Sequence, residues 1–266
     1  MGRVTKTTIA KDLGVSRQSL YYKSKKEAKD EVLKEHILQV LAVHKSYGYR
    51  RIAIALRANK KRVQRVMHEF KIRPYKRKMR WKKRLDLRRE PMPYVNLIKG
   101  WCPLRSGMVY ASDFTYLPFK GRFIYLATIM DVYTREIIGW EISLRHDMEL
   151  VANALIKGLY NNGFRRPEII HSDQGSEYCS KGYIKFLKFL GIRISMSKKS
   201  SPWENGYQES YYSNFKTDLG LELDRFNDIG EFIEAIHQTI HYYNNHRIHT
   251  SLKMAPSVFA SLHKSV

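Results

Sequence analysis

The stretch MVYASDFTYLPFKGRFIYLATIMDVYTREIIGWEIS, residues 108–143, alternates apolar and polar residues over much of its length. A repeat of two residues predicts β-strands. Gly121 and the segment YTRE at 133–136 are turn signals, and they divide the stretch into strands at about 109–117, 123–131 and 136–143. Because the connections are short, we expect the three strands to be antiparallel.

Helices and strands alternate after this stretch. The pattern predicts a helix near 147–161, a short buried strand at EIIHS (168–172), a helix at about 180–190 and a strand at IRISM (192–196). Antiparallel strands followed by alternating helices and strands predict an α/β fold, with a mixed sheet and helices on its faces.

The opening segment TTIAKDLGVSRQSLYY, residues 7–22, reads as two short helices around a turn at Gly14. Ser16 is a good N-cap for the second helix, which would present Arg17 and Gln18 outward. This is a helix-turn-helix pattern, and an ordinary helical hairpin remains the alternative.

Helical periodicity continues from residue 30 to about residue 70, where YGYRRIAIALRANKKRVQRVMHEF (47–70) suggests a second helix-turn-helix. The run KIRPYKRKMRWKKRLDLRRE that follows has eleven basic residues between Lys71 and Arg89 and lacks apolar periodicity, which predicts a linker lying along phosphates. The predicted DNA contacts in these two segments are Arg50, Arg51, Lys61, Arg62, Arg65, Lys76, Arg77 and Lys78.

Positive charge is concentrated in the first part of the 266-residue chain. Residues 1–100 contain 29 Lys or Arg against 8 Asp or Glu, whereas residues 101–266 contain 19 against 17. This asymmetry favours nucleic acid as the partner over an anionic membrane surface, which would call for an amphipathic helix with large apolar anchors. Two cysteines without a close partner, and no long apolar stretch, predict a soluble protein of the reducing cytoplasm, associated with the nucleoid and not with a membrane.

Three carboxylates stand in positions that a purely structural role explains poorly. Asp113 lies in the middle of a predicted strand, Asp173 follows a buried strand, and Glu209 lies in the helical run QESYYSNFKTDL. Each alone is more often structural than functional. Together they would form an all-oxygen site for hard cations, and two Mg²⁺ ions would suit phosphodiester displacement.

Other residues near the carboxylates have competing interpretations. Lys216, two helical turns after Glu209, could hold the next phosphate or be a solvated lysine, and Lys198 and Lys199 are further predicted DNA contacts. Asp131 could be a fourth ligand, but a turn residue is favoured. The cluster His241, His246 and His249 lacks the spacing of a familiar zinc site.

Between Asp173 and Glu209 lie 35 residues, which resembles the D, D-35-E arrangement of retroviral integrases and insertion-sequence transposases. SDFTYLP, HSDQGSEY and PWENGYQES are similar to the family's three carboxylate motifs, and YNNHRIHTSLKMAPSVF is similar to its C-terminal signature. The chain most resembles the second-frame transposases of the IS-three group, within the DDE superfamily. Glu177, Glu204 and Ile248 depart from common choices in that group, and Glu204 is a competing glutamate.

The resemblance implies a ribonuclease-H-like core with Asp113, Asp173 and Glu209 as catalytic and metal-binding residues. It implies magnesium, with manganese as a substitute, strand cleavage and transfer, a homo-oligomer that pairs two element ends, and an upstream-frame protein or fusion. The expected division is 1–28 and 29–73 for DNA binding, 74–102 for the linker, 103–222 for the catalytic core and 223–266 for a helical extension. A catalytically inactive DNA-binding regulator or assembly subunit is the alternative.

Overall fold

The structure, a computed structural model, describes residues 5–21, 26–76, 94–198, 202–220 and 222–263. It divides once, between Pro74 and Tyr75, into two compact units, which are described separately. No helix in the described residues is long and apolar enough to cross a membrane. The finer predicted boundaries, at residues 28, 102 and 222, stay predictions.

The first unit begins with the two predicted short helical segments. Helix α1 spans Lys6–Asp12, and the second segment, η1 at Arg17–Tyr21, is a short 3-10 helix. Gly14 lies between them with a φ of 64°, a conformation in which glycine carries no steric cost. The hydroxyl of Ser16 accepts a hydrogen bond from the Ser19 amide at 3.2 Å, which confirms the predicted N-cap.

Three further helices form the remainder of this unit. They are α2 (Lys26–Val43), α3 (Tyr49–Ala55) and α4 (Lys60–Glu69), and the last two confirm the predicted pair of helical runs. Helix α2 contacts both α3 and α4. The apolar residues buried in this bundle are Leu33, Ile37, Ile52, Ala53, Val63, Val66 and Met67. Asn59 caps α4, because its side-chain oxygen accepts from the Lys61 amide at 2.9 Å.

An ion-pair cluster joins α2 to α4. Asp30 is only 2% exposed, and its carboxylate binds Arg65 Nη2 at 2.8 Å and Arg62 Nη2 at 3.4 Å. Burial raises the pKa of Asp30, but the hydrogen bonds and charges of Arg65 and Arg62 outweigh burial and leave this pKa below its ordinary value. The structure therefore gives both arginines a role within the fold, and their predicted contact with DNA stays a prediction.

The second unit contains the predicted mixed sheet of five strands, in the order β3-β2-β1-β4-β5. Strands β1 (Val109–Phe119), β2 (Arg122–Asp131) and β3 (Ile137–Ser143) are antiparallel to their neighbours. Strands β4 (Ile169–Ser172) and β5 (Arg193–Met196) run parallel to β1. All five strands agree within two residues with the bounds predicted from the sequence.

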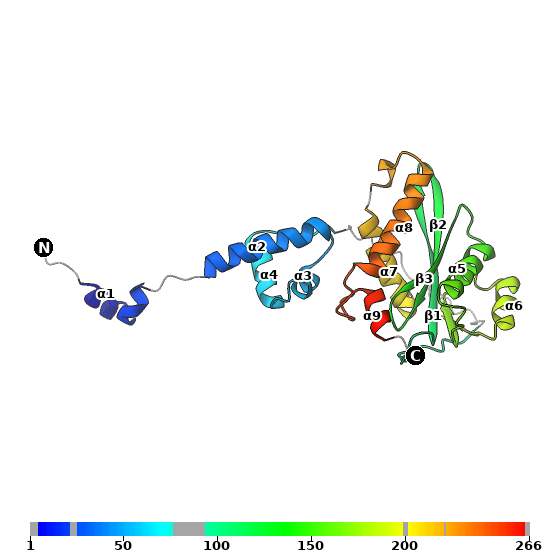
Figure 1. Cartoon of the computed structure of the whole chain (residues 1–266), viewed down its shortest axis with the longest axis horizontal. Coiled ribbons are helices and arrows are strands. Elements are labelled where there is room, and N and C mark those ends of the chain that lie inside the picture. Colours follow the sequence, from blue (N-terminus) through cyan, green and yellow to red (C-terminus); the bar gives the residue numbers. More distant parts are fainter. Residues whose placement is uncertain (1–4, 22–25, 77–93, 199–201, 221, 264–266) are drawn as a thin grey trace. The chain divides into compact units, whose positions relative to one another are not determined.

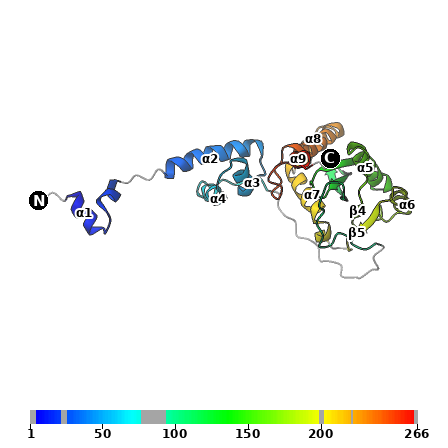
Figure 2. The same cartoon turned by 60° about the horizontal axis from the view of Figure 1, so that its bottom comes forward.

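Helices cover both faces of the sheet (Figure 1). Helices α5 (Met148–Asn161) and α6 (Lys181–Phe189) pack on one face, around Tyr110, Ile129 and Leu155. Helices α7 (Gly206–Leu219) and α8 (Ile229–Asn245) pack on the other, around Leu126, Phe215 and Phe232. Figure 2 shows α6 beside β4 and β5, at the parallel edge of the sheet.

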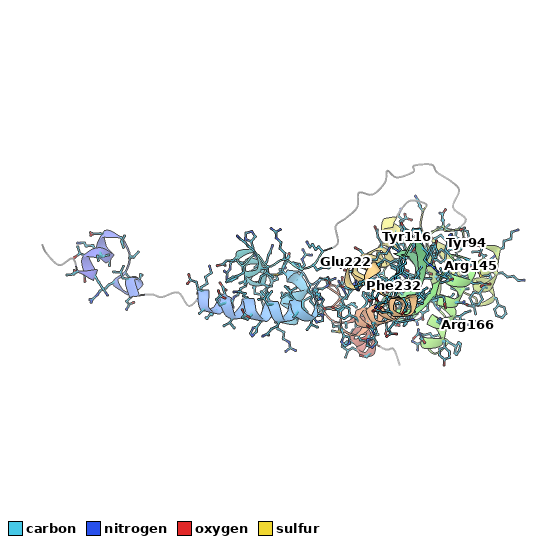
Figure 3. The ribbon with its side chains drawn as sticks, turned by 90° about the horizontal axis from the view of Figure 1, so that it is seen from above. Tyr94, Tyr116, Arg145, Arg166, Glu222 and Phe232 are labelled. Atoms are coloured by element: carbon cyan, nitrogen blue, oxygen red, sulfur yellow. The ribbon has the colours of Figure 1, made fainter. Side chains whose placement is uncertain are left out.

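The C-terminal helices are part of this second core. Phe232 of α8 lies in the interior in Figure 3 and stacks on Phe119 with ring centroids 4.8 Å apart. Asn244 accepts from the Ile137 amide at 2.9 Å and donates to the Ile137 carbonyl at 2.8 Å, which fixes the end of α8 to β3. Helix α9 (Pro256–Leu262) contacts α8, and the short helices η2 (Pro202–Asn205) and η3 (Leu223–Arg225) flank α7.

We expect Gly139→Ala to destabilise this unit at the upper end of the range of about 1–3 kcal/mol for overpacking a core. A Cβ atom at Gly139 of β3 would lie 2.4 Å from the Ala154 carbonyl oxygen and from the Gly158 amide of α5. A Cβ at Gly158 would meet only ordinary contacts of 3.5 Å, so Gly158→Ala is the matched control. Because alanine favours a helix by about 1 kcal/mol over glycine, the control should unfold at the wild-type temperature or above. Equal unfolding temperatures for the two variants in a thermal melt would contradict the direct packing of α5 on β3.

Candidate active site

Asp113 lies on β1, and Asp173 directly follows β4, the parallel neighbour of β1. Ala111 of β1 pairs with His171 of β4, and each aspartate is two residues further along its chain. Adjacent strands are about 4.8 Å apart, so this register brings the two aspartates level with each other at the carboxyl end of β4. The carboxyl ends of strands are favoured positions for ligand-binding and active sites in α/β proteins.

The electrostatics of the pair are unfavourable without a counter-charge. Burial, and next the charge of Asp173, raise the pKa of Asp113 to about 8, against opposing contributions from the Phe114 amide and Lys216. Burial also raises the pKa of Asp173, and the charge of Glu177 adds to this, although the Gly175 amide donates to Asp173 Oδ1 at 2.9 Å. The charged form of both carboxyls is therefore disfavoured, first by burial and then by a neighbouring carboxylate.

Glu209 enters the site on the first turn of α7, and its neighbours on the helix hold β1. Gln208 Nε2 donates to the Ala111 carbonyl at 2.7 Å, and the Tyr212 hydroxyl donates to the Asp113 carbonyl at 2.7 Å. Both side chains are buried. Glu209 follows Gln208 on the helix and is half-buried. Its charge raises the pKa of Asp113, although four other effects, burial first among them, change that pKa more. The helix is thereby fixed to the strand on both sides of Glu209.

The contacts of Gln208 and Tyr212 with β1 were not predicted from the sequence. The sequence did contain an indication of these contacts. Gln208 and Tyr212 carry polar groups, stand four positions apart on either side of Glu209, and so share one face of the helix. Asn205, just before the helix, adds a weaker bond from Nδ2 to the Ser112 carbonyl at 3.4 Å.

Lys216 lies on the active-site side of α7. Its ammonium donates to the Tyr116 carbonyl at 3.2 Å and lies 5.2 Å from the centroid of the Tyr116 ring. Its charge lowers the pKa of Asp113, so the lysine lies within electrostatic range of that carboxyl. Whether Lys216 also binds phosphate stays a prediction.

A second carboxylate stands next to Asp173. Glu177 is buried, and its Oε1 lies 2.7 Å from His146 Nδ1. A Cβ at Gly175 would lie 2.9 Å from Glu177 Oε2 and 3.1 Å from Asp173 Oδ1, so a larger residue there would displace one or both carboxylates. From the sequence, Glu177 was recognisable only as a departure from common choices in the family.

The donor set suits a hard divalent cation. Carboxylate oxygens are the ligands that magnesium prefers, and a cation would offset the burial and the charge of Asp173 that raise the pKa of Asp113. Within the described residues, no three His, Cys, Asp or Glu side chains are already arranged to hold a metal ion. The structure thus shows a close pair with a third carboxylate nearby, and a metal centre with three carboxylate ligands stays a prediction.

Two acidic alternatives have structural roles. Asp131 is buried and accepts hydrogen bonds from Ser106 Oγ and the Gly107, Tyr133 and Thr134 amides at 2.8–3.1 Å, which confirms the turn interpretation. Glu204 Oε2 accepts from the Lys198 amide at 2.8 Å and from Asn96 Nδ2 at 3.1 Å. Burial raises the pKa of Glu204, but these bonds and nearby lysine charges outweigh it and lower the pKa.

The predicted DNA contacts are distributed over both units. Most of those described are exposed: Arg17, Gln18, Arg50, Lys61, Arg62, Lys76 and Lys198. Arg51 is half-buried, with its guanidinium carbon 5.8 Å from the Tyr47 ring centroid. Arg77, Lys78 and Lys199 lie outside the described residues. The rings of His241 and His246 are 5.7 Å apart, and they belong to no metal-binding group in the described part of the chain.

Residues 103–202 match the family described as Integrase core domain, and residues 190–256 match a second family with the same description. The transposase of the insertion sequence element IS904 from Lactococcus lactis is 34% identical over 241 residues, which cover 86% of this chain and 93% of that protein. A 31 kDa protein of the insertion element IS600 from Shigella sonnei is 30% identical, over 92% of this chain and 95% of the relative.

A solved structure shares the fold. A chain in the intasome of simian T-cell lymphotropic virus, determined with a PP2A regulatory subunit, superposes with a TM-score of 0.53 at 17% identity, over 87% of this chain and 75% of that one. The mixed five-stranded sheet with flanking helices is accordingly a ribonuclease-H-like core of the retroviral integrase type, preceded by a helical region.

Proposed function

Since this chain belongs to the transposases of bacterial insertion sequences, we propose that it binds the ends of its element and catalyses magnesium-dependent strand cleavage and strand transfer. The chain is a DNA transposase, and its reaction class is that of a DDE polynucleotidyl transferase. The single observation that most supports the proposed site is the pair Asp113 and Asp173, level on parallel strands and short of positive charge. The alternative, a catalytically inactive DNA-binding regulator, is not favoured.

In this proposal Asp113 and Asp173 hold one magnesium ion between them, and Glu209 completes the site of a second. Manganese can substitute for magnesium. When bound, the ions activate the attacking oxygen and stabilise the leaving oxygen of the phosphodiester. Gln208 and Tyr212 hold β1 against α7, which keeps the carboxylates of Asp113 and Glu209 in a fixed relation.

Water or a DNA 3′-hydroxyl is the proposed nucleophile, and Lys216 is the proposed contact to the next phosphate along the strand. The basic first unit and the segment after it bind the element ends. Pairing of two ends requires an oligomer, and an upstream-frame protein or fusion completes the assembly. The proposed location is the cytoplasm, on the nucleoid.

Removal of divalent cations tests this proposal. We expect strand transfer on labelled end DNA to stop in EDTA and to return when magnesium or manganese is added in excess. Without cation, Asp113 retains a proton at neutral pH because its pKa is about 8, so cation binding should release protons. Proton release is measured by calorimetry in two buffers of different ionisation enthalpy.

The control for the EDTA experiment is Glu149→Gln, which removes an exposed carboxylate from α5 outside the site. This variant should need the same magnesium concentration as the wild type. Cation-independent strand transfer by the wild type would refute the proposed site, and cation-dependent binding without any chemistry would favour the regulator.

A further inference from the structure

Five ring-bearing residues form a continuous group on the α5 side of the sheet, called here the aromatic face: Phe114, Tyr116, Phe123, Tyr125 and His146. The first four alternate along β1 and β2, where Tyr116 pairs with Tyr125 and Pro118 with Phe123. The hairpin that carries them extends past the end of α5 (Figure 1). His146, which precedes α5, stacks over the group, 4.8 Å from the Tyr125 ring and 6.2 Å from the Phe114 ring.

Three of these rings are open to solvent: those of Tyr116, Phe123 and His146. Tyr116 is 57% exposed and Phe123 is 50% exposed, and their centroids lie 5.3 Å apart in an edge-to-face arrangement. The inner members, Phe114 and Tyr125, are half-buried. A paired, exposed set of rings on a sheet surface is unlike the scattered single apolar residues that are normal on protein surfaces. It is the arrangement on which nucleic-acid bases stack in sheet-based binding proteins.

The aromatic face is continuous with the proposed catalytic site. The amide of Phe114 donates to Asp113 Oδ1 at 2.9 Å, and Lys216 contacts the ring and carbonyl of Tyr116. At the other side, His146 binds Glu177, whose charge acts on Asp173. A strand whose phosphate lies at Asp113 and Asp173 would therefore bring its neighbouring nucleotides to these rings.

The charges around the rings fit a DNA strand. Arg122 and Arg145 are exposed next to Phe123 and His146 along the chain, and Lys216 lies on the ring of Tyr116. Cations around exposed rings favour a phosphate backbone with stacked bases over a purely apolar partner.

We propose that the aromatic face binds one or two unpaired bases next to the scissile phosphate, with Tyr116 and Phe123 as the stacking residues. This inference rests on the proposed strand-transfer function and adds to it a site for separated bases. The ring faces can stack on any base, so binding here requires unpairing and not a particular sequence.

The test measures binding of the full-length protein to two end duplexes without divalent cation, so that the strands stay intact. One duplex carries two unpaired nucleotides beside the cleavage position, and the other carries abasic nucleotides there. The wild type should bind the first about tenfold more tightly, because stacking on an aromatic side chain contributes about 1–3 kcal/mol per base. The variant Tyr116→Ala with Phe123→Ala should bind both duplexes equally.

Phe189→Ala is the matched control, because Phe189 is 84% exposed at the end of α6 and lies outside the aromatic face. It should keep the tenfold ratio. Tyr116→Leu with Phe123→Leu retains apolar bulk without rings and should lose the ratio, which separates stacking from loss of folded protein; thermal melts check folding directly.

A wild-type ratio near one, or a tenfold ratio retained by the double alanine variant, overturns the proposal. If that variant instead changes the sedimentation coefficient and keeps the ratio, the face is a contact with a second copy of the chain. Strand transfer by the wild type, run in parallel with magnesium and with the upstream-frame protein or fusion present, distinguishes the failures. Transfer without a ratio refutes only this inference, whereas no transfer refutes the proposed function.

Discussion

Asp173→Asn is expected to reduce magnesium-dependent strand transfer by about a thousandfold or more and to leave the binding of end DNA unchanged. A bound metal contributes several kcal/mol of charge stabilisation in the transition state, and about 4 kcal/mol corresponds to a thousandfold in rate. Asparagine removes the negative charge that would hold the cation. The measurement is the rate of joining of a labelled 3′ end to target DNA, with binding followed separately by gel shift.

The substitution is conservative for the fold, which makes the result interpretable. Asparagine keeps the oxygen that accepts from the Gly175 amide, and it relieves the repulsion from Asp113 and Glu177. The variant should therefore unfold no earlier than the wild type in the absence of cation. Wild-type rates in Asp173→Asn would refute the assignment of Asp173. Loss of DNA binding together with activity would show that the residue supports structure or end recognition, and not the reaction alone.

Local patterns in the sequence predicted most of the second unit. The two-residue repeat located β1 to β3, and the apolar run before Asp173 located β4. The same patterns placed Asp113 on one strand and Asp173 at the end of another, without saying that the two strands are neighbours. Their adjacency depends on the sheet order, in which β4 pairs with β1 and not with β3.

Contacts between remote segments could not be predicted from these patterns. Arg62 and Arg65 were predicted to contact DNA because they lie on a basic helix. In the structure both guanidinium groups bind the carboxylate of Asp30, more than 30 residues earlier in the chain. The clamp of Gln208 and Tyr212 on β1 likewise joins residues nearly 100 positions apart. Periodicity gives the face of a helix, but the partner of that face is decided by tertiary packing.

The second large effect expected is a steep loss of DNA affinity with salt for the basic part of the chain. A fragment of residues 1–100 should bind duplex DNA, and an improved boundary is residue 93, because Ile98 is buried in the second unit and Tyr94 packs against its core. Residues 1–93 retain 28 basic residues against 8 acidic ones. If 6–10 of these contact phosphates, affinity should fall by about 10³–10⁵ between 50 and 200 mM salt.

Single substitutions should reveal which lysines and arginines cause this salt dependence. Lys61→Gln removes an exposed charge from α4 and should lower the slope of log affinity against log salt by about 0.9. Arg65→Gln would not be an equivalent test, because Arg65 binds the buried Asp30 and its loss weakens the join between α2 and α4. Residues 94–266 are the control fragment, and their nearly balanced charge predicts a shallow slope. If the DNA affinity of the first fragment does not depend on salt, its positive charge does not bind phosphates. Recognition of the element ends would then have to come from the catalytic unit.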